Sequence, residues 1–164
     1  MLTLTNEQLQ AQAQLQTRLV HMHLDDITHA ESCIAPVGGN SANWVLGHLI
    51  VSRDDIISML GGTRSQSAAM QARYGAGSQA ITAPANDITD LNTLIKLWDE
   101  QAPQFYAQLL TATPELYAQE VTRRDGSKTT LSTRIAFYLL FHEAFHLGQL
   151  EYTRHAAGKH NGLI

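Results

Sequence analysis

The chain has 164 residues, of which 44% are hydrophobic and 16% are charged, a composition typical of a folded globular protein. Its formal net charge of −4, with eight histidines counted as neutral, argues against a nucleic-acid-binding protein. The sequence contains no apolar run of transmembrane length, no signal-peptide pattern and a single cysteine, Cys33, which excludes an internal disulfide. We therefore expect one domain, residues 1–164, that resides in the cytoplasm and contacts neither nucleic acid nor membrane.

The first two predicted elements are long helices. A capping box of Thr5 and Gln8 opens the first helix, which is expected to run to about Ser32. Its apolar residues fall near helical spacing, which predicts one buried face. Asn40 or Ser41 can cap the second helix, whose sequence is largely apolar.

A long loop is expected between the second and third helices. The second helix should stop at the glycine pair 61–62, and residues 61–86 are rich in Gly, Ser, Ala and Gln. A loop of this length in a compact domain indicates function or mobility. The third helix is predicted over residues 88–111, where Pro103 should kink or split it.

The last part of the chain predicts a turn and a fourth helix. Asp125-Gly126 is a turn signal that suggests a small hairpin. The fourth helix should cover residues 131–157 and end at Gly158. Four long helices joined by loops predict an all-α four-helix bundle.

His142 and His146 are the strongest candidates for metal ligands. A spacing of four residues leaves them about 40° apart around a helix and one turn apart along it, so both rings can reach one ion. The surrounding segment 138–149 is strongly apolar, and burying two imidazoles without partners is costly. A shared metal ion would satisfy both, although two surface histidines with the same spacing are the alternative.

Residues 142–146 also match the HExxH pattern, which supplies two ligands and a glutamate base in zinc proteases. Only 18 residues follow this motif to offer a downstream third ligand, and Gln149 stands where the longer pattern has Gly. A zinc-dependent hydrolase is therefore the less favoured interpretation. We expect Glu143 not to be a ligand, and to pair with Arg53 or Arg134 or meet solvent.

His48 offers a third ligand upstream, midway in the apolar stretch of the second helix. Gly47 beside it lacks a side chain and could let a neighbouring helix approach closely. Ser52 and Asp55 lie within about 40° of His48 on the same helical face, so either could bond a ring nitrogen and select its tautomer. Taken alone, His48 is better explained as a core histidine bonded to a backbone carbonyl.

Two further patterns are weaker. A di-iron carboxylate bundle needs two Glu-x-x-His motifs and two more glutamates, and only Glu143 with His146 fits fully. The remaining five histidines are expected at the surface: His21, His23, His29, His155 and His160.

Three segments together resemble the DinB-like (YfiT-like) family of metalloenzymes. They read SANWVLGHL at 41–49, RYGAGS at 73–78 and HEAFHLGQ at 142–149, and the resemblance covers essentially the whole chain in order and spacing. It implies an up-down-down-up four-helix bundle. It also implies a metal ion held by one histidine of the second helix and two of the fourth, which here are His48, His142 and His146.

The resemblance also carries an expected function. Three neutral imidazoles suit Zn²⁺, Ni²⁺ or Fe²⁺ and leave one coordination position open. Members of the family include thiol S-transferases and a thiol-dependent maleylpyruvate isomerase, in which a metal-activated low-molecular-weight thiolate attacks an electrophile. The resemblance therefore implies a homodimeric metal-dependent transferase acting on a small molecule. A non-catalytic bundle that binds a metal or ligand is the alternative, which a closed fourth ligand would favour.

Overall fold

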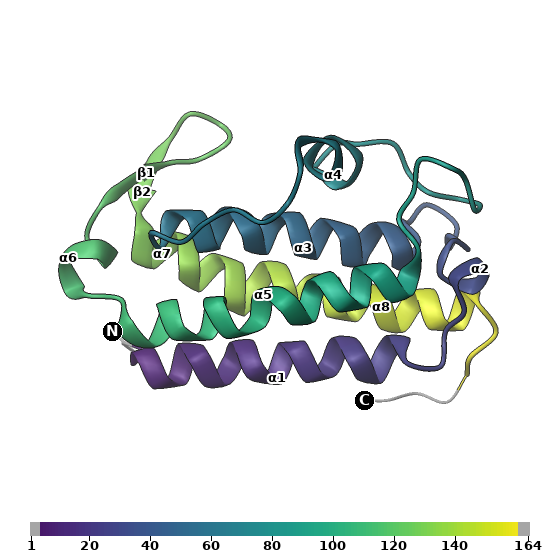
Figure 1. Cartoon of the computed structure of the whole chain (residues 1–164), viewed down its shortest axis with the longest axis horizontal. Helices are drawn as coiled ribbons and strands as arrows, with labels where there is room; N and C mark the ends of the chain where they lie inside the picture. Colours follow the sequence, from purple (N-terminus) through teal and green to yellow (C-terminus); the bar gives the residue numbers. More distant parts are fainter. Residues whose placement is uncertain (1–3, 161–164) are drawn as a thin grey trace.

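The computed structural model describes residues 4–160, and four long helical segments form its body (Figure 1). α1 and α3 each pack against both α5 and α8, so the segments surround a shared interior. The all-α class expected from the sequence is confirmed. The segments are α1 (Asn6–Leu24), α3 (Ala42–Met59), α5 (Leu91–Thr111) and a C-terminal one of α7 (Leu131–Phe137), η1 (Tyr138–His142) and α8 (Glu143–Ala156).

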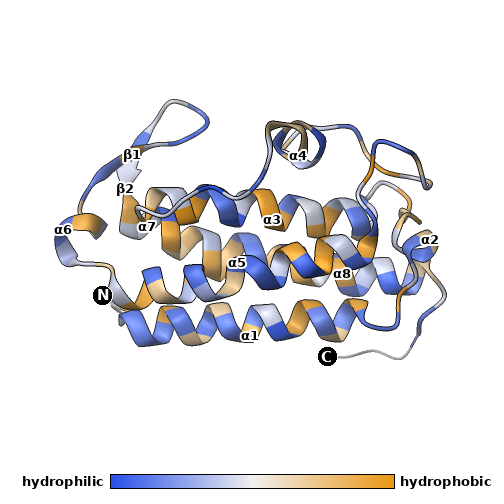
Figure 2. Cartoon of the chain, viewed as in Figure 1, coloured by the Kyte–Doolittle hydropathy of each residue, from blue (hydrophilic) through white to orange (hydrophobic). Residues whose placement is uncertain are grey.

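The long helices differ in how much of their surface is buried. α1 is mainly hydrophilic with a hydrophobic stripe (Figure 2), and its buried positions repeat at helical spacing. In α3, by contrast, every residue from Ala42 to Val51 is buried. α3 therefore carries its side chains, including His48, into the interior rather than onto the surface. Among the described residues, no helix combines the length and apolar character needed to cross a membrane.

Short elements lie outside the four long segments: α2 (His29–Ser32), α4 (Ala68–Tyr74), α6 (Pro114–Tyr117), β1 (Glu120–Thr122) and β2 (Lys128–Thr130). β1 and β2 pair antiparallel, with Val121 opposite Thr129. Gly126 in the connecting turn has a φ of +83°, which explains why the turn needs glycine. The predicted hairpin is confirmed, whereas α4, inside the expected long loop, was not predicted.

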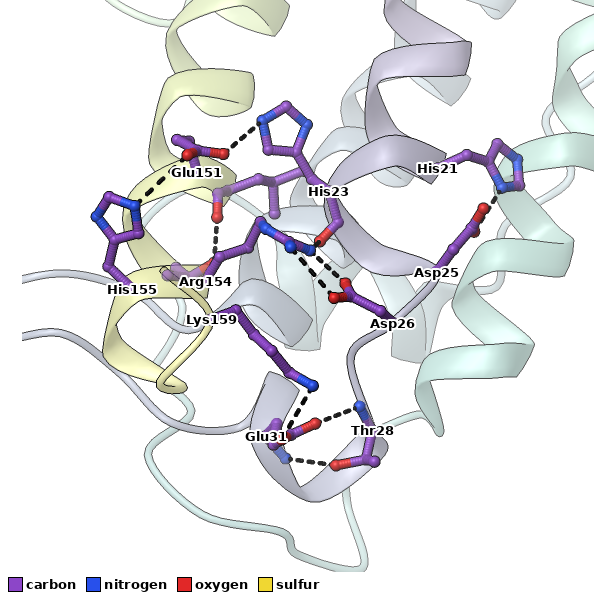
Figure 3. Close-up of polar contacts among 12 residues, drawn as sticks. His21, His23, Asp25, Asp26, Thr28, Glu31, Glu151, Arg154, His155 and Lys159 are labelled. Atoms are coloured by element: carbon purple, nitrogen blue, oxygen red, sulfur yellow. Dashed lines mark hydrogen bonds and ion pairs between the residues drawn. The ribbon is translucent and has the colours of Figure 1, made fainter. Parts of the chain in front are cut away.

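The first helix ends at Leu24, so the prediction that it continues to Ser32 was wrong. Thr28 is in an extended conformation and forms a second capping box with Glu31, which starts α2 (Figure 3). Between the two helices, the buried guanidinium of Arg154 from α8 donates to the His23 carbonyl at 2.7 Å and to Asp26. These bonds hold the chain at the break.

The third and fourth long segments cover nearly the predicted residues, and each has one unexpected feature. α5 continues through Pro103 as one helix, so the proline does not split it. Pro103 lies on the exposed face, where water can bond the freed carbonyl. The fourth helix is not regular, since Tyr138–His142 form a π-helical turn in which Glu143 N–H bonds to the Tyr138 carbonyl, five residues earlier. Such turns occur often at functional sites, and this one ends at His142.

Candidate metal centre

α4 positions the ring of His48. The Tyr74 side chain, at the end of α4, is buried against Gly47, where an added Cβ would lie 2.1 Å from Tyr74 Cδ1. The absent side chain thus lets a neighbouring helix, α4, approach closely through its Tyr74, as the sequence suggested. The hydroxyl of Tyr74 donates to Asn43 Oδ1 at 3.1 Å. The backbone carbonyl of Tyr74 accepts from His48 Nδ1 at 2.9 Å.

Because His48 Nδ1 donates to a carbonyl, its Nε2 carries no proton when the ring is neutral. This Nε2 faces His142 Nε2 at 3.1 Å, and the Trp44 ring stacks on the His48 ring with 4.8 Å between centroids. Of the two polar residues expected near the ring, Ser52 Oγ lies 3.5 Å from Nε2. Asp55 instead pairs with Arg64.

The two histidines of the C-terminal segment are held in different ways. His146 Nδ1 bonds to Gln149 Oε1 at 2.6 Å, and this bond also leaves the Nε2 of the neutral ring unprotonated. The His142 ring stacks on Tyr138, with 5.4 Å between centroids. Its buried Nδ1 has no hydrogen-bond partner among the described residues, so stacking on Tyr138 and the contact of its Nε2 with His48 orient the ring.

The structure brings the three predicted histidines together, with one ring nitrogen of each within 4.8 Å of the others. A shared proton could join His48 Nε2 to His142 Nε2, but it would leave the nitrogen of His146 unsatisfied. One metal ion about 2.0–2.1 Å from each nitrogen would satisfy all three, because tetrahedral ligands at that radius are about 3.3 Å apart. The donor set thus fits Zn²⁺, Ni²⁺ or Fe²⁺.

Burial keeps the cluster in the neutral form that binds metal. It lowers the pKa of His142 to about 3, where the neighbouring His146, His48 and Arg134 add smaller effects in the same direction. It lowers the pKa of His146 to about 4, with a contribution from His48, and also lowers the pKa of His48. All three imidazoles are therefore neutral near pH 7, as metal ligands must be.

These shifts predict that acid destabilises the metal-free protein. The unfolded histidines titrate near 6.5, so between that pH and about 4 the unfolded chain binds more protons than the folded chain. The stability due to neutral His142 and His146 is complete above pH 6.5 and is lost as the pH falls. We expect the melting temperature to fall on the order of 5–10 °C between pH 7 and 5. The His142→Gln/His146→Gln variant should lose clearly less, and an equal loss in both proteins would contradict the prediction.

Glu143 is buried, and its carboxylate bonds to other side chains instead of joining the three histidines. Its Oε1 accepts from Arg53 Nη2 at 2.8 Å, from Arg53 Nε at 3.1 Å and from the Tyr138 hydroxyl at 2.6 Å. Burial raises the pKa of Tyr138 well above 10, and the Glu143 charge adds to this, so the hydroxyl stays a donor. Glu143 is not in the converging cluster, and the expected pairing with Arg53 is confirmed.

Most of the other histidines lie where the sequence predicted. His155 and His160 are exposed, and His21 and His29 are partly exposed beside aspartates. The expectation was wrong for His23, which is fully buried and bonds through Nδ1 to the Leu19 carbonyl. Its Nε2 lies 3.4 Å from Glu151, which also approaches His155 (Figure 3).

An open pocket of about 680 Å³ reaches two of the clustered histidines, His48 and His142. Cavities of this size hold small-molecule ligands. Its other walls come from α3, from the end of α4, from the β1–β2 hairpin and from α7. These walls include Ser52 and Asp55, Gly75 and Ala76, residues 122–125, and Thr133, Arg134 and Phe137. No local pattern in the sequence indicated that the hairpin borders the cluster, because only the fold brings the two together.

The close contact between Gly47 and the Tyr74 ring can be tested by adding a methyl group at Gly47. Gly47→Ala should lower the free energy of unfolding by about 1–3 kcal/mol, because the added methyl group overlaps the Tyr74 ring and must displace it. Gly148→Ala is the matched control, since that helical glycine is exposed with open space around it and alanine there should stabilise by up to about 1 kcal/mol. Urea unfolding of both variants measures the effects. Equal stability of the two would show that Tyr74 does not need the glycine.

Comparison with known proteins adds a family. A family model described as the DinB superfamily matches residues 5–150. This range includes all three clustered histidines and most of the chain. Comparisons with curated proteins and with solved structures find no match.

Proposed function

The chain belongs to the DinB superfamily, and on this premise we propose that it is a metal-dependent enzyme that transfers a low-molecular-weight thiol to a small electrophile. The observation that carries the proposal is the convergence of three neutral ring nitrogens beside an open pocket. Three protein ligands leave a coordination position for a substrate, which is the catalytic rather than the structural arrangement of such sites.

The residues of the chain have distinct roles in this proposal. His48, His142 and His146 would hold the divalent metal, whose charge would keep a thiol ionised near neutral pH. The Tyr74 carbonyl and the Gln149 side chain select the tautomers of two of these rings and orient them. The pocket beside them admits both reactants, so that the thiol sulfur can form its bond to an electrophilic carbon as the leaving group departs.

Two alternatives are less well supported. A non-catalytic metal-binding bundle would favour a fourth protein ligand, but the converging group contains only three residues within the described range 4–160. A zinc-dependent hydrolase needs a glutamate beside the metal, whereas the bonded oxygen of Glu143 is held by Arg53 and Tyr138. The open pocket therefore favours an enzyme over a non-catalytic bundle, and the contacts of Glu143 favour a transferase over a hydrolase.

The test is metal analysis of protein purified without a histidine tag, followed by assays of thiol conjugation to monochlorobimane. Cysteine, glutathione and coenzyme A serve as thiols. We expect about one metal ion per chain and a rate above the uncatalysed reaction that disappears in His142→Ala. Bound metal without conjugation of any thiol would favour the non-catalytic alternative. Absence of metal would contradict the enzyme and favour a non-catalytic bundle that binds a small ligand.

The proposal includes an up-down-down-up helix order, a cytoplasmic location and a homodimer. The homodimer is supported by an exposed aromatic stripe on the C-terminal segment. Phe137, Phe141, Phe145 and Tyr152 are each about half exposed, and the rings of the first three lie in succession, with 5.2 and 6.0 Å between their centroids. Light scattering should give about twice the chain mass of 18.1 kDa, and a mass near 18.1 kDa would contradict the dimer.

A further inference from the structure

The pocket beside the histidines collects arginines that form no ion pair with a carboxylate among the described residues. The chain has eleven lysines and arginines, all within the described residues, and seven of them form ion pairs with carboxylates. The four that do not are Arg18, Arg123, Arg124 and Arg134, and the last three line this pocket. In a chain with a net charge of −4, unpaired cations are therefore concentrated at one place.

The three arginines come from two elements that border the pocket. Arg123 and Arg124 lie in the turn of the β1–β2 hairpin, which bends toward α4 (Figure 1). Arg124 Nη2 lies 3.5 Å from the position that a Cβ on Gly77 would occupy, so this guanidinium reaches the segment that follows α4. Arg134 lies on α7, two turns before His142. The three arginines thus line the side of the pocket that the hairpin and α7 form.

The polar contacts of these arginines leave their charge available. Within the described residues, the guanidinium of Arg123 donates only to Thr129 Oγ1, at 3.3 Å, and the guanidinium carbon of Arg134 lies 5.8 Å from the Phe137 ring centroid. Arg124 has no hydrogen bond or ion pair within the part of the chain that the structure describes.

The two acidic residues of the pocket bond to groups other than these arginines, and only Asp125 is near enough to attract one of them, Arg123. Asp55 pairs with Arg64. Asp125 Oδ1 accepts from the Ser127 backbone N–H at 2.9 Å and from the Ser127 hydroxyl at 2.6 Å. The pocket therefore keeps unpaired guanidinium groups, which suit oxyanions because their donors match carboxylate and phosphate geometry.

We propose that the ligand of this pocket is a small anion whose carboxylate or phosphate groups bind Arg123, Arg124 and Arg134, while its reacting group faces the histidine cluster. This inference deepens the proposed function, on which it rests for the reacting group, by giving the substrate or its thiol partner a negative charge. Three cations at the opening also raise the local concentration of an anionic ligand, so binding should weaken with salt.

The first experiment uses metal-free protein, so it does not depend on the proposed chemistry. Calorimetric titration compares succinate, inorganic phosphate and the neutral succinamide on wild type, on Arg124→Gln/Arg134→Gln and on Arg18→Gln. Arg18 is the matched control because it is also unpaired but lies on α1, outside the pocket. We expect succinate or phosphate to bind wild type and Arg18→Gln equally, and the double variant about tenfold more weakly. The tighter of the two anions identifies the ligand chemistry.

The second experiment adds the reacting group. Protein loaded with Co²⁺ is titrated with mercaptosuccinate, which carries a thiol and two carboxylates, and with the neutral 2-mercaptoethanol, while cobalt absorption is followed. Mercaptosuccinate should saturate wild type at a roughly tenfold lower concentration than 2-mercaptoethanol does. This difference between the two thiols should disappear in Arg124→Gln/Arg134→Gln. Circular dichroism checks that each variant is folded, and the single Arg124→Gln variant at the exposed hairpin serves if the double variant is not.

The outcomes separate the two proposals. Anion binding that is equal in wild type and in the folded arginine variants, or no preference for mercaptosuccinate, overturns the anionic ligand while thiol binding to the metal stands. The proposed function is overturned if Co²⁺ does not bind, or if neither thiol binds to the Co²⁺-loaded protein. Arginine-dependent binding of succinate or phosphate to the metal-free protein would still support the anionic ligand in that case.

Discussion

His142→Ala is expected to abolish metal binding, with an affinity loss beyond the roughly 10- to 100-fold that removal of an outer partner of a ligand costs. The reason is geometric: His142 Nε2 lies 3.1 Å from His48 Nε2 and completes the converging group. Without it only two protein nitrogens remain, too few for the three-ligand site of a catalytic metal. Metal content after dialysis and titration with Co²⁺ measure the loss.

Two controls show whether the loss is specific to the cluster. His155→Ala removes an exposed histidine of the same C-terminal segment and should keep the metal. Glu143→Gln should also keep it, because the carboxylate bonds to Arg53 and Tyr138 rather than joining the cluster. Circular dichroism must show that each variant is folded. Loss of metal from folded Glu143→Gln to the same extent as from His142→Ala would show that the ligands were wrongly assigned.

Arg53→Met is expected to lower the free energy of unfolding of the metal-free protein by about 3–5 kcal/mol, the usual cost of leaving a buried charge without its partner. Arg53 and Glu143 are both completely buried, and the guanidinium makes two bonds to one carboxylate oxygen. Its carbon also lies 3.2 Å from the Trp98 ring centroid, which methionine covers only in part. After the substitution, Tyr138 alone donates to the carboxylate. Urea unfolding measures the change.

A double variant tests whether the cost comes from the unpaired charge. Arg53→Met/Glu143→Leu removes both charges and should be more stable than Arg53→Met alone, since two apolar side chains can replace a buried ion pair. Arg18→Met removes an exposed, unpaired arginine and should change the free energy by no more than about 0.5 kcal/mol. A double variant less stable than Arg53→Met would mean that packing, and not charge, dominates at this position.

Local patterns predicted those features that depend on near neighbours in the chain. The capping box at Thr5, the N-cap at Ser41 and the glycine of the hairpin turn all form as expected. The break after α1 had a readable signal as well, because Thr28 and Glu31 have the spacing of a capping box. Each of these features rests on bonds between residues at most a few positions apart, so composition and spacing are enough to indicate them.

Side-chain partners distant in sequence needed the tertiary structure. Spacing indicated His142 with His146, but His48 is 94 positions from His142, and only its resemblance to the family motif singled it out before the fold placed it. For Glu143, both Arg53 and Arg134 remained open until packing buried Arg53 against it. No local pattern in the sequence indicated that the hairpin arginines line the same pocket as the histidines.

The sequence by itself thus determined the helical class, most helix boundaries and the i, i+4 pair of ligands. Helical periodicity and capping act over one or two turns, and this range is fully visible in a linear chain. The tertiary structure alone decided that the Tyr74 carbonyl orients His48, that a π-turn ends at His142, and that three arginines line the pocket. Those features depend on which helix faces pack together, and burial rather than local propensity selects that packing.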